Sequence, residues 1–292
     1  MSVIRKIDPI RAATPQGAAA TAEPHALVFD SGIGGLSVFG EVAALMPGLS
    51  LTYAADNAAF PYGPKPEDAL VARVTDVLGR LVGHTRPDVV VIACNTASTH
   101  ALDAAREILS VPIVGVVPAI KPAAAASATR TIGLLATAAT VASPYTRSLI
   151  DRFADGCRVV CCGAPELVEA AERKLQGEPP EPAMIASMLD RMLGAPGGGD
   201  IDIAVLGCTH FPLLKPELAA AAEQRGQRIQ WIDSGAAIAR RVRTILDKAG
   251  RTLPEAPSLP RTAIFTARTD AVARMKPQLA QFGLAAIDYL QI

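Results

Sequence analysis

Short, continuously apolar segments alternate with longer segments of helical periodicity along most of this chain. Apolar runs of strand length occur at 25–30, 49–56, 89–94, 112–117, 131–137, 158–163, 201–208, 228–233 and 262–267. Between them, apolar residues recur at the spacing of one helix face, as in 36–46, 67–83 and 96–109. Strands that are apolar throughout and separated by helices are typical of parallel sheets covered by helices on both faces. The pattern therefore predicts an α/β fold.

The order of these segments restarts near the middle of the chain. In each half an early strand ends in a small polar turn and a later strand ends in a cysteine, Cys94 or Cys208. The separation of 208 − 94 = 114 residues is about one small domain. We predict two similar doubly wound domains with parallel sheets, related by pseudo-twofold symmetry. Residues 25–116 with 230–292 form the first, residues 117–229 form the second, and residues 1–24 are a flexible extension. Ligands bind at the carboxyl ends of such strands, so we expect the site in the cleft between the domains.

Composition narrows the classes of protein that need to be considered. Half of the 292 residues are hydrophobic and 19% are charged, which fits a well-buried globular core. A formal net charge of zero argues against nucleic acid as a partner, because that affinity depends on clustered Lys and Arg. No apolar stretch is long enough to span a bilayer, and the first 24 residues lack the apolar region of a secretory signal. Five cysteines without regular spacing favour free thiols and a cytoplasmic location.

The two strand-end cysteines have closely matched surroundings, VIACNTAS at 91–98 and IAVLGCTHFP at 203–212. A free thiol is only slightly ionised at neutral pH, and a helix N-terminus or a nearby cation increases the ionised fraction. A predicted helix follows each cysteine, and His210 lies two positions after Cys208. The remaining cysteines are interpreted as packing residues: Cys157, Cys161 and Cys162.

Three kinds of chemistry fit Cys94, Cys208 and His210. A metal site could use all three, but the usual C-x-x-C pairs are missing. A Cys–His hydrolase could use Cys208 and His210, and it would leave Cys94 without a role. In a third scheme one thiolate removes a proton from a substrate carbon and the opposite thiol delivers one to the other face, which inverts the centre. This scheme uses both cysteines and needs no metal and no cofactor.

The turn DSGIGG at 30–35 follows the first strand. Its glycines allow tight turning and close backbone approach to an anion. It does not match the dinucleotide fingerprint, because Ser37 stands where the last glycine is required. Asp30 could bind a substrate ammonium or cap the following helix. Ser31 could donate to a substrate carboxylate or cap the same helix. Further donors beside the thiols and in the loop PYG are Tyr62, Gly63, Asn95, Thr96 and Thr209.

Several segments together resemble the glutamate racemases of the cofactor-independent aspartate/glutamate racemase superfamily. They are FDSGIGGLSV, ADNAAFPYGPKP, VIACNTAS, PIVGVVPAIKPA, GLLAT, LGCTHFPLL and DSGAAIARR, in the right order from about residue 27 to 241. The resemblance implies reversible interconversion of L- and D-glutamate without a cofactor, with glutamate as the small-molecule partner. It further implies that D-glutamate supplies bacterial peptidoglycan synthesis, and it allows a homodimer. The alternative reactions are aspartate racemisation and the reaction of a single-thiol relative such as an isomerase or decarboxylase, and the non-catalytic alternative is a binding module.

The resemblance also implies roles for individual residues. Cys94 would act on the D-face of the substrate and Cys208 on the L-face, assisted by Asp30 and His210 respectively. Glu166, in APELVE, matches a family acidic residue that supports the second thiol. Substrate binding falls to Asp30, Ser31, Tyr62, Gly63, Asn95, Thr96, Thr209 and His210. Looser matches for contact with the substrate carboxylate are Thr137 and Thr140.

Overall fold

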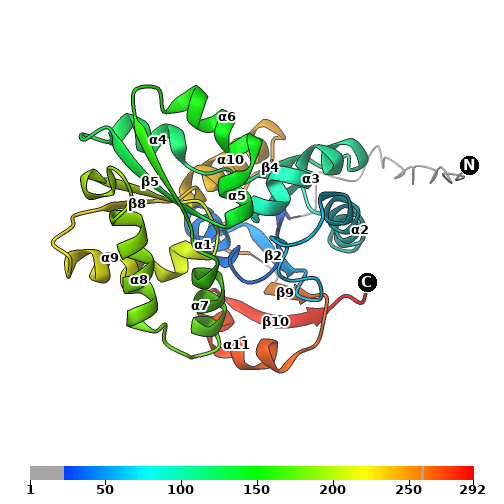
Figure 1. Cartoon of the computed structure of the whole chain (residues 1–292). Helices are drawn as coiled ribbons and strands as arrows, with labels where there is room; N and C mark the ends of the chain where they lie inside the picture. The colour runs from blue at the N-terminus through cyan, green and yellow to red at the C-terminus, as the bar shows by residue number, and fades with distance from the viewer. Residues whose placement is uncertain (1–22, 258–259) are drawn as a thin grey trace, which may run out of the picture.

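Two separate parallel sheets organise the chain in the computed structural model, which describes residues 23–257 and 260–292 (Figure 1). The first sheet has the order β10-β9-β2-β1-β3-β4, and the second has the order β6-β5-β7-β8. Every strand pairing in both is parallel, which confirms the predicted α/β fold. The predicted extension at residues 1–24 lies, except for its last two residues, outside the described residues.

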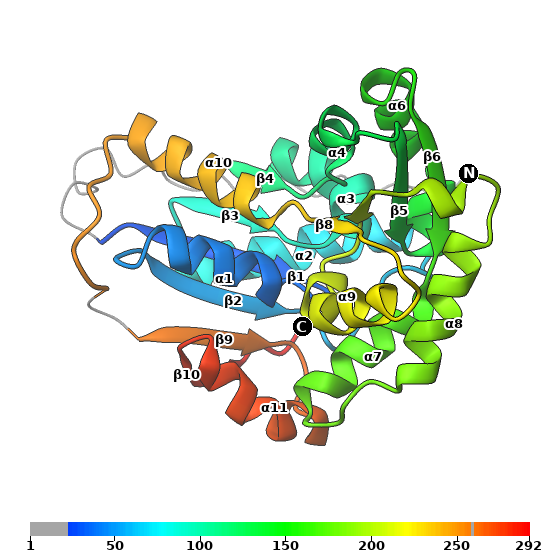
Figure 2. The same cartoon turned by 90° about the vertical axis from the view of Figure 1, so that its left-hand side faces the viewer.

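The strands of the first sheet are β1 His25–Asp30, β2 Ser50–Ala55, β3 Val89–Ile92, β4 Ile113–Gly115, β9 Arg261–Phe265 and β10 Leu284–Tyr289. Those of the second are β5 Thr131–Ala136, β6 Arg158–Gly163, β7 Ile203–Leu206 and β8 Gln230–Ile232. The helices are α1 Leu36–Leu45, α2 Glu67–Thr85, α3 Asn95–Ile108, α4 Ile120–Ala126, α5 Ala138–Ala142, α6 Pro144–Phe153, α7 Pro165–Leu175, α8 Pro182–Leu193, α9 Lys215–Glu223, α10 Gly235–Lys248 and α11 Asp270–Gln281. Figure 2 shows the two sheets side by side, each with its own helices.

Helices cover both faces of the first sheet, as β1 illustrates. Its side chains alternate, so Leu27 and Phe29 enter one core with α2 and α3, while Ala26 and Val28 enter another with α1 and α10. The helix α2 buries Leu70, Val74, Val77, Leu78 and Leu81, which share one face. Because both faces of the strand are buried, its apolar run is continuous rather than alternating.

Two segments connect the sheets, and they touch each other. The strand β8 pairs with β7, so the chain returns to the first sheet after Ile232, slightly later than the predicted return at residue 230. Just beyond it, the hydroxyl of Ser234 donates to the backbone carbonyl of Val117, which lies in the other connection. A carboxylate oxygen of Asp233 accepts from the Gly235 amide at 2.8 Å. Ser234 therefore joins the two connections, while Asp233 caps α10. The division into two domains stays a prediction based on this sheet membership.

Within the described ranges, no helix combines the length and the apolar character needed to cross a membrane.

The buried central strand yields a stability prediction. Leu27 is fully buried, and replacing such a leucine by alanine leaves a cavity, so Leu27→Ala should lower the free energy of unfolding by about 2–5 kcal/mol. Leu45 is 45% exposed at the end of α1, and Leu45→Ala is the matched control, expected within about 0.5 kcal/mol of the parent. Urea denaturation followed by circular dichroism measures both. Equal losses in the two variants would contradict the placement of β1 at the centre of the core.

Candidate functional site

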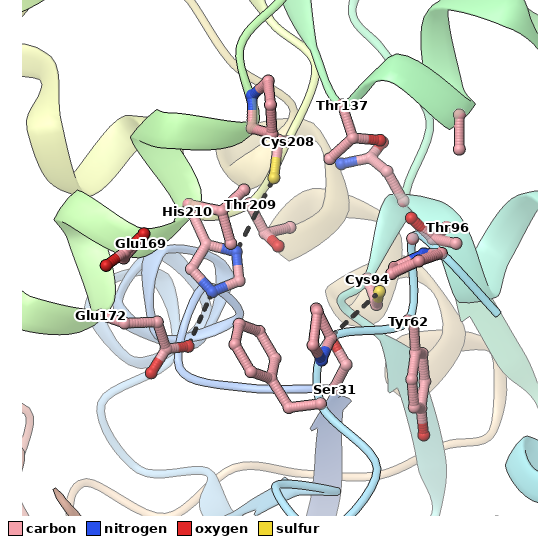
Figure 3. A pocket seen from close by; sticks show the side chains of 18 of the residues that line it. Ser31, Tyr62, Cys94, Thr96, Thr137, Glu169, Glu172, Cys208, Thr209 and His210 are labelled. Carbon is pink, nitrogen blue, oxygen red and sulfur yellow. Dashed lines mark hydrogen bonds and ion pairs between the residues drawn. The ribbon is translucent and has the colours of Figure 1, made fainter. Parts of the chain in front are cut away.

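A cavity of about 660 Å³ opens at the carboxyl ends of strands from both sheets. Ser31 and Cys94 enter it from the ends of β1 and β3 of the first sheet. Thr137 and Cys208 enter it from the ends of β5 and β7 of the second sheet. Figure 3 shows both sulfurs directed into this space. The volume lies in the range that suits a small-molecule ligand.

Cys94 lies beside a carboxylate. It follows β3 and Ala93, precedes α3, and is 6% exposed, with its sulfur 3.7 Å from the hydroxyl oxygen of Ser31. The carboxylate of Asp30 is fully buried behind the same turn and accepts the amides of Ser31 at 2.7 Å and Gly35 at 2.6 Å. Burial raises the pKa of Asp30, and burial together with the Asp30 charge raises the pKa of the Cys94 thiol. At neutral pH Cys94 is therefore a neutral thiol that can donate a proton.

Cys208 lies beside an imidazole. It follows β7 and Gly207, is 7% exposed, and its sulfur is 3.7 Å from Nδ1 of His210. The other ring nitrogen of His210 is 2.9 Å from Oε1 of Glu172, which α7 carries. Burial by itself would lower the pKa of His210, but the hydrogen bonds to Cys208 and Glu172 outweigh it and hold this pKa well above its usual value. A protonated imidazole between a sulfur and a carboxylate stabilises negative charge on the sulfur.

The start of α3 can bind the polar groups of a ligand. Asn95 and Thr96 are its first two residues, and both are buried beside the cavity. The first amides of a helix have no partner within the helix and attract a carboxylate. Oδ1 of Asn95 is buried and, among the residues the structure describes, has no hydrogen-bond partner. It can accept a hydrogen bond from a ligand ammonium or amide.

These features give the cavity a proton donor on one side and a candidate proton acceptor on the other. The two cysteines occupy corresponding positions at strand ends, yet one faces a carboxylate and the other an imidazole. Such a pair suits acid–base chemistry at a single carbon of a small polar substrate.

Comparison with known proteins agrees with this geometry. Residues 37–242 match the family model described as Asp/Glu/Hydantoin racemase. The chain belongs to this family. A glutamate racemase of Klebsiella pneumoniae is 46% identical over 97% of this chain and 96% of its own length. One of Sphingopyxis alaskensis is also 46% identical, over 90% of this chain and 96% of its own length.

A solved structure shows the same arrangement. The crystal structure of Escherichia coli glutamate racemase in complex with L-glutamate and activator UDP-MurNAc-ala superposes with a TM-score of 0.84. It is 42% identical in sequence, and the match covers 92% of this chain and 99% of that one. The chain is thus a racemase, an enzyme of the isomerase class.

Most of the residues expected at the site line the cavity. They are Ser31, Tyr62, Gly63, Cys94, Asn95, Thr96, Thr137, Cys208, Thr209 and His210. Thr140 does not line it, and its hydroxyl oxygen lies 2.9 Å from that of Thr137. Their roles toward a substrate stay predictions.

Three expected contacts differ from what the structure shows. Asp30 does not line the cavity, because its carboxylate turns back onto the amides of Ser31 and Gly35. Among the side chains that line the cavity, the hydroxyl of Ser31 lies 3.4 Å from this carboxylate. The hydroxyl of Tyr62 donates to Asp56 at 2.7 Å and points away from the sulfurs (Figure 3), so the loop presents the ring rather than the hydroxyl.

Glu166 is the third residue whose contacts differ from the expectation. It pairs with Arg191 outside the cavity and makes no contact with His210, so it does not support the second thiol as expected. Glu172, six residues later on the same helix, holds His210 instead. Figure 3 shows the carboxylate of Glu172 directed at the imidazole. The sequence signal was a row of three glutamates, 166, 169 and 172, at three-residue spacing on one predicted helix.

The metal site considered from the sequence would have used Cys94, Cys208 and His210. Among the described residues, no group of three or more His, Cys, Asp or Glu side chains is arranged to hold a metal ion. Both ring nitrogens of His210 already have protein partners, Cys208 and Glu172.

The Glu172–His210 pair can be tested without a substrate. Glu172→Gln removes the charge facing the imidazole and should lower the pKa of His210 by about one unit or more. The chain has four histidines, so NMR of histidine-labelled protein resolves the titration, with His210 assigned from a His210→Asn variant.

Glu166→Gln is the matched control and should leave the His210 titration in place, because the carboxylate of Glu166 pairs with Arg191.

Since folding raises the pKa of His210, the contribution of His210 to stability is present at low pH and is lost as the pH rises through the raised value. A His210 titration that follows Glu166 rather than Glu172 would refute the assignment.

Proposed function

We propose that this racemase interconverts L- and D-glutamate by a two-thiol mechanism that uses no cofactor. The observation that carries the proposal is that Cys94 and Cys208, from corresponding strand ends of two different sheets, line one cavity. Relatives named glutamate racemase match nearly the full chain, and the solved relative binds L-glutamate, which supports the choice of substrate.

In the proposed reaction Cys208 acts on L-glutamate as a thiolate. It removes the α-proton, and the electron pair of the C–H bond remains on the α-carbon next to the carboxylate. The Cys94 thiol then delivers its proton to the opposite face and forms D-glutamate. This leaves Cys94 as thiolate and Cys208 as thiol, which is the state required for the reverse reaction. The imidazolium of His210 stabilises the thiolate of Cys208, and Ser31 offers a hydroxyl to that of Cys94.

Substrate binding follows from the polar groups around the thiols. The amides at the start of α3 and the hydroxyls of Ser31 and Thr96 would bind a carboxylate. The free Oδ1 of Asn95 would accept from the ammonium group. Thr209, next to Cys208, would hold the same carboxylate or the distal one. These contacts fix the α-carbon between the sulfurs, which proton transfer on opposite faces requires.

The setting in the cell is part of the proposal. All five cysteines are free thiols, which supports a cytoplasmic location. D-glutamate made there would supply peptidoglycan synthesis, as the resemblance implies. A homodimer is also proposed on the basis of the resemblance, and sedimentation of the purified chain would test it.

Cysteine substitutions test the mechanism. Cys94→Ser and Cys208→Ser should each reduce racemisation by about 10²–10⁴-fold or more, because a serine hydroxyl is a far weaker acid and base. Circular dichroism of glutamate and proton exchange in deuterated water measure inversion. Cys161→Ser, on the exposed edge strand β6, is the control and should retain full activity. A Cys94 or Cys208 variant with undiminished activity would rule out the two-thiol scheme, and faster turnover of aspartate would change the substrate.

The unequal surroundings of the thiols predict selective alkylation. Cys208 should react with iodoacetamide before Cys94 at neutral pH, because His210 faces its sulfur while Cys94 lies near Asp30. Peptide mass spectrometry after partial reaction measures the order of modification. Glutamate should slow both reactions, and His210→Asn should abolish the preference for Cys208. Preferential labelling of Cys94 in the parent would show that the resting protonation state is the opposite one.

A further inference from the structure

The glycine-rich turn after β1 contacts the second sheet's side of the cavity. The amide of Ile33 donates to Oε1 of Glu172 at 3.0 Å, the same oxygen that His210 contacts at 2.9 Å. The hydroxyl of Ser37 lies 2.8 Å from the backbone carbonyl of Thr209, between Cys208 and His210 in the chain. It is also 2.8 Å from the carbonyl of Gly34. Two hydrogen bonds thus connect this turn to the group that serves Cys208.

The glycines make this approach possible. A Cβ at Gly34 would overlap Nδ1 of His210 and lie 2.7 Å from its backbone nitrogen. A Cβ at Gly32 would overlap Oε1 of Glu172. Of residues 31–37, only Ser31 lines the cavity. The anion that the turn binds is therefore the protein's own Glu172 carboxylate, and the glycines leave room for residues of the other sheet.

We propose that Ser37 and the backbone amide of Ile33 position the group formed by Cys208, His210 and Glu172. This group has its full set of contacts only while the turn at residues 31–37 is docked against it. The inference rests on the proposed function for its effect on turnover, but its effect on His210 needs no substrate. Ser37 is a positioning residue that acts through the Thr209 carbonyl and touches neither thiol. Cys94 lies on the turn's own side and should be affected less.

The equilibrium between the glutamate enantiomers fixes the ratio of kcat/KM in the two directions of racemisation. Because the enantiomers have equal free energy, any variant must change kcat/KM equally in the two directions. A defect on the side of Cys208 instead appears in the isotope effect on the step where Cys208 removes hydrogen. α-Deuterated L-glutamate reports that step under the proposed assignment, and α-deuterated D-glutamate reports removal by Cys94.

Ser37→Ala is the principal variant. We expect kcat/KM to fall by about 2- to 13-fold, the factor for loss of one hydrogen bond. The isotope effect should rise with deuterated L-glutamate and not with deuterated D-glutamate, and the NMR titration of His210 should shift in the absence of substrate. Ser37→Thr, which keeps the hydroxyl, should restore all three. Gly34→Ala should produce the same signature with a larger loss, because its methyl group displaces His210 directly.

Matched controls separate this role from general structural damage. The hydroxyl of Ser148 donates to the carbonyl three residues earlier, but it is exposed and, unlike that of Ser37, has no partner across the cavity among the described contacts. Ser148→Ala should therefore leave the His210 titration and both isotope effects unchanged. Gly79 has open space around its Cβ position in α2, and Gly79→Ala is the control for Gly34→Ala.

The outcomes distinguish the two proposals. An unchanged His210 titration in both Ser37→Ala and Gly34→Ala overturns the positioning role, whatever the substrate is. A shifted titration in a protein that does not racemise glutamate leaves the positioning role standing and removes the proposed function. A raised isotope effect with deuterated D-glutamate instead of L-glutamate contradicts coupling to Cys208.

Discussion

The placement of two buried sulfurs at the ends of β3 and β7 is the constraint on which the site depends. Each sulfur sits where a fully apolar strand gives way to a polar turn, and each is less than a tenth exposed. A buried ionisable group is stable only if a partner compensates for lost hydration or if it stays neutral. The chain uses both solutions. Cys94 stays neutral near Asp30, and Cys208 has the imidazole of His210.

This difference distinguishes two strand ends that occupy corresponding places in the two sheets. Parallel sheets that are covered on both faces place the carboxyl ends of their strands in equivalent positions, so the backbone alone would make the two thiols alike. The side chains that surround them are not alike. In the proposed mechanism one thiol begins as the donor and the other as the acceptor, and turnover exchanges their states. A reaction that runs equally well in both directions requires such an exchange, because each product must meet the reverse arrangement.

The sequence was sufficient for the parts of the fold and site that depend on local pattern. The strands β3 and β7 were predicted because their apolar runs are continuous, and the thiols because their contexts repeat. Long-range contacts were not predictable in this way. The three glutamates of α7 share one helix, and only the docking of that helix selects Glu172, which meets His210 38 positions away. The strand β10 was missed because it is an edge strand of which only Leu284 is fully buried, and the apolar run in its segment LAAIDY is only four residues long.

Local pattern does not decide which partner a polar side chain at a strand or helix end takes. Asp30 stands at a strand end, where ligands bind, but the amides of Ser31 and Gly35 take up its carboxylate. Ser234 is the N-cap residue of α10, but its side chain makes no capping hydrogen bond, and its hydroxyl donates to the carbonyl of Val117 in the other connection between the sheets. At both positions a backbone group takes up the polar side chain.

The turns that follow β1 and β5 each lead to contacts between the two halves of the chain. The turn after β1 reaches His210 and Glu172, on the side of Cys208. The corresponding turn after β5 leads into α5, which packs against α3, the helix that begins next to Cys94. Each half thus contacts an element of the other half that adjoins a strand-end cysteine, and under the proposed mechanism neither half holds a complete acid–base group by itself. Opening of the cleft would weaken both sides together, and this ties the chemistry of the site to the relative position of the two sheets.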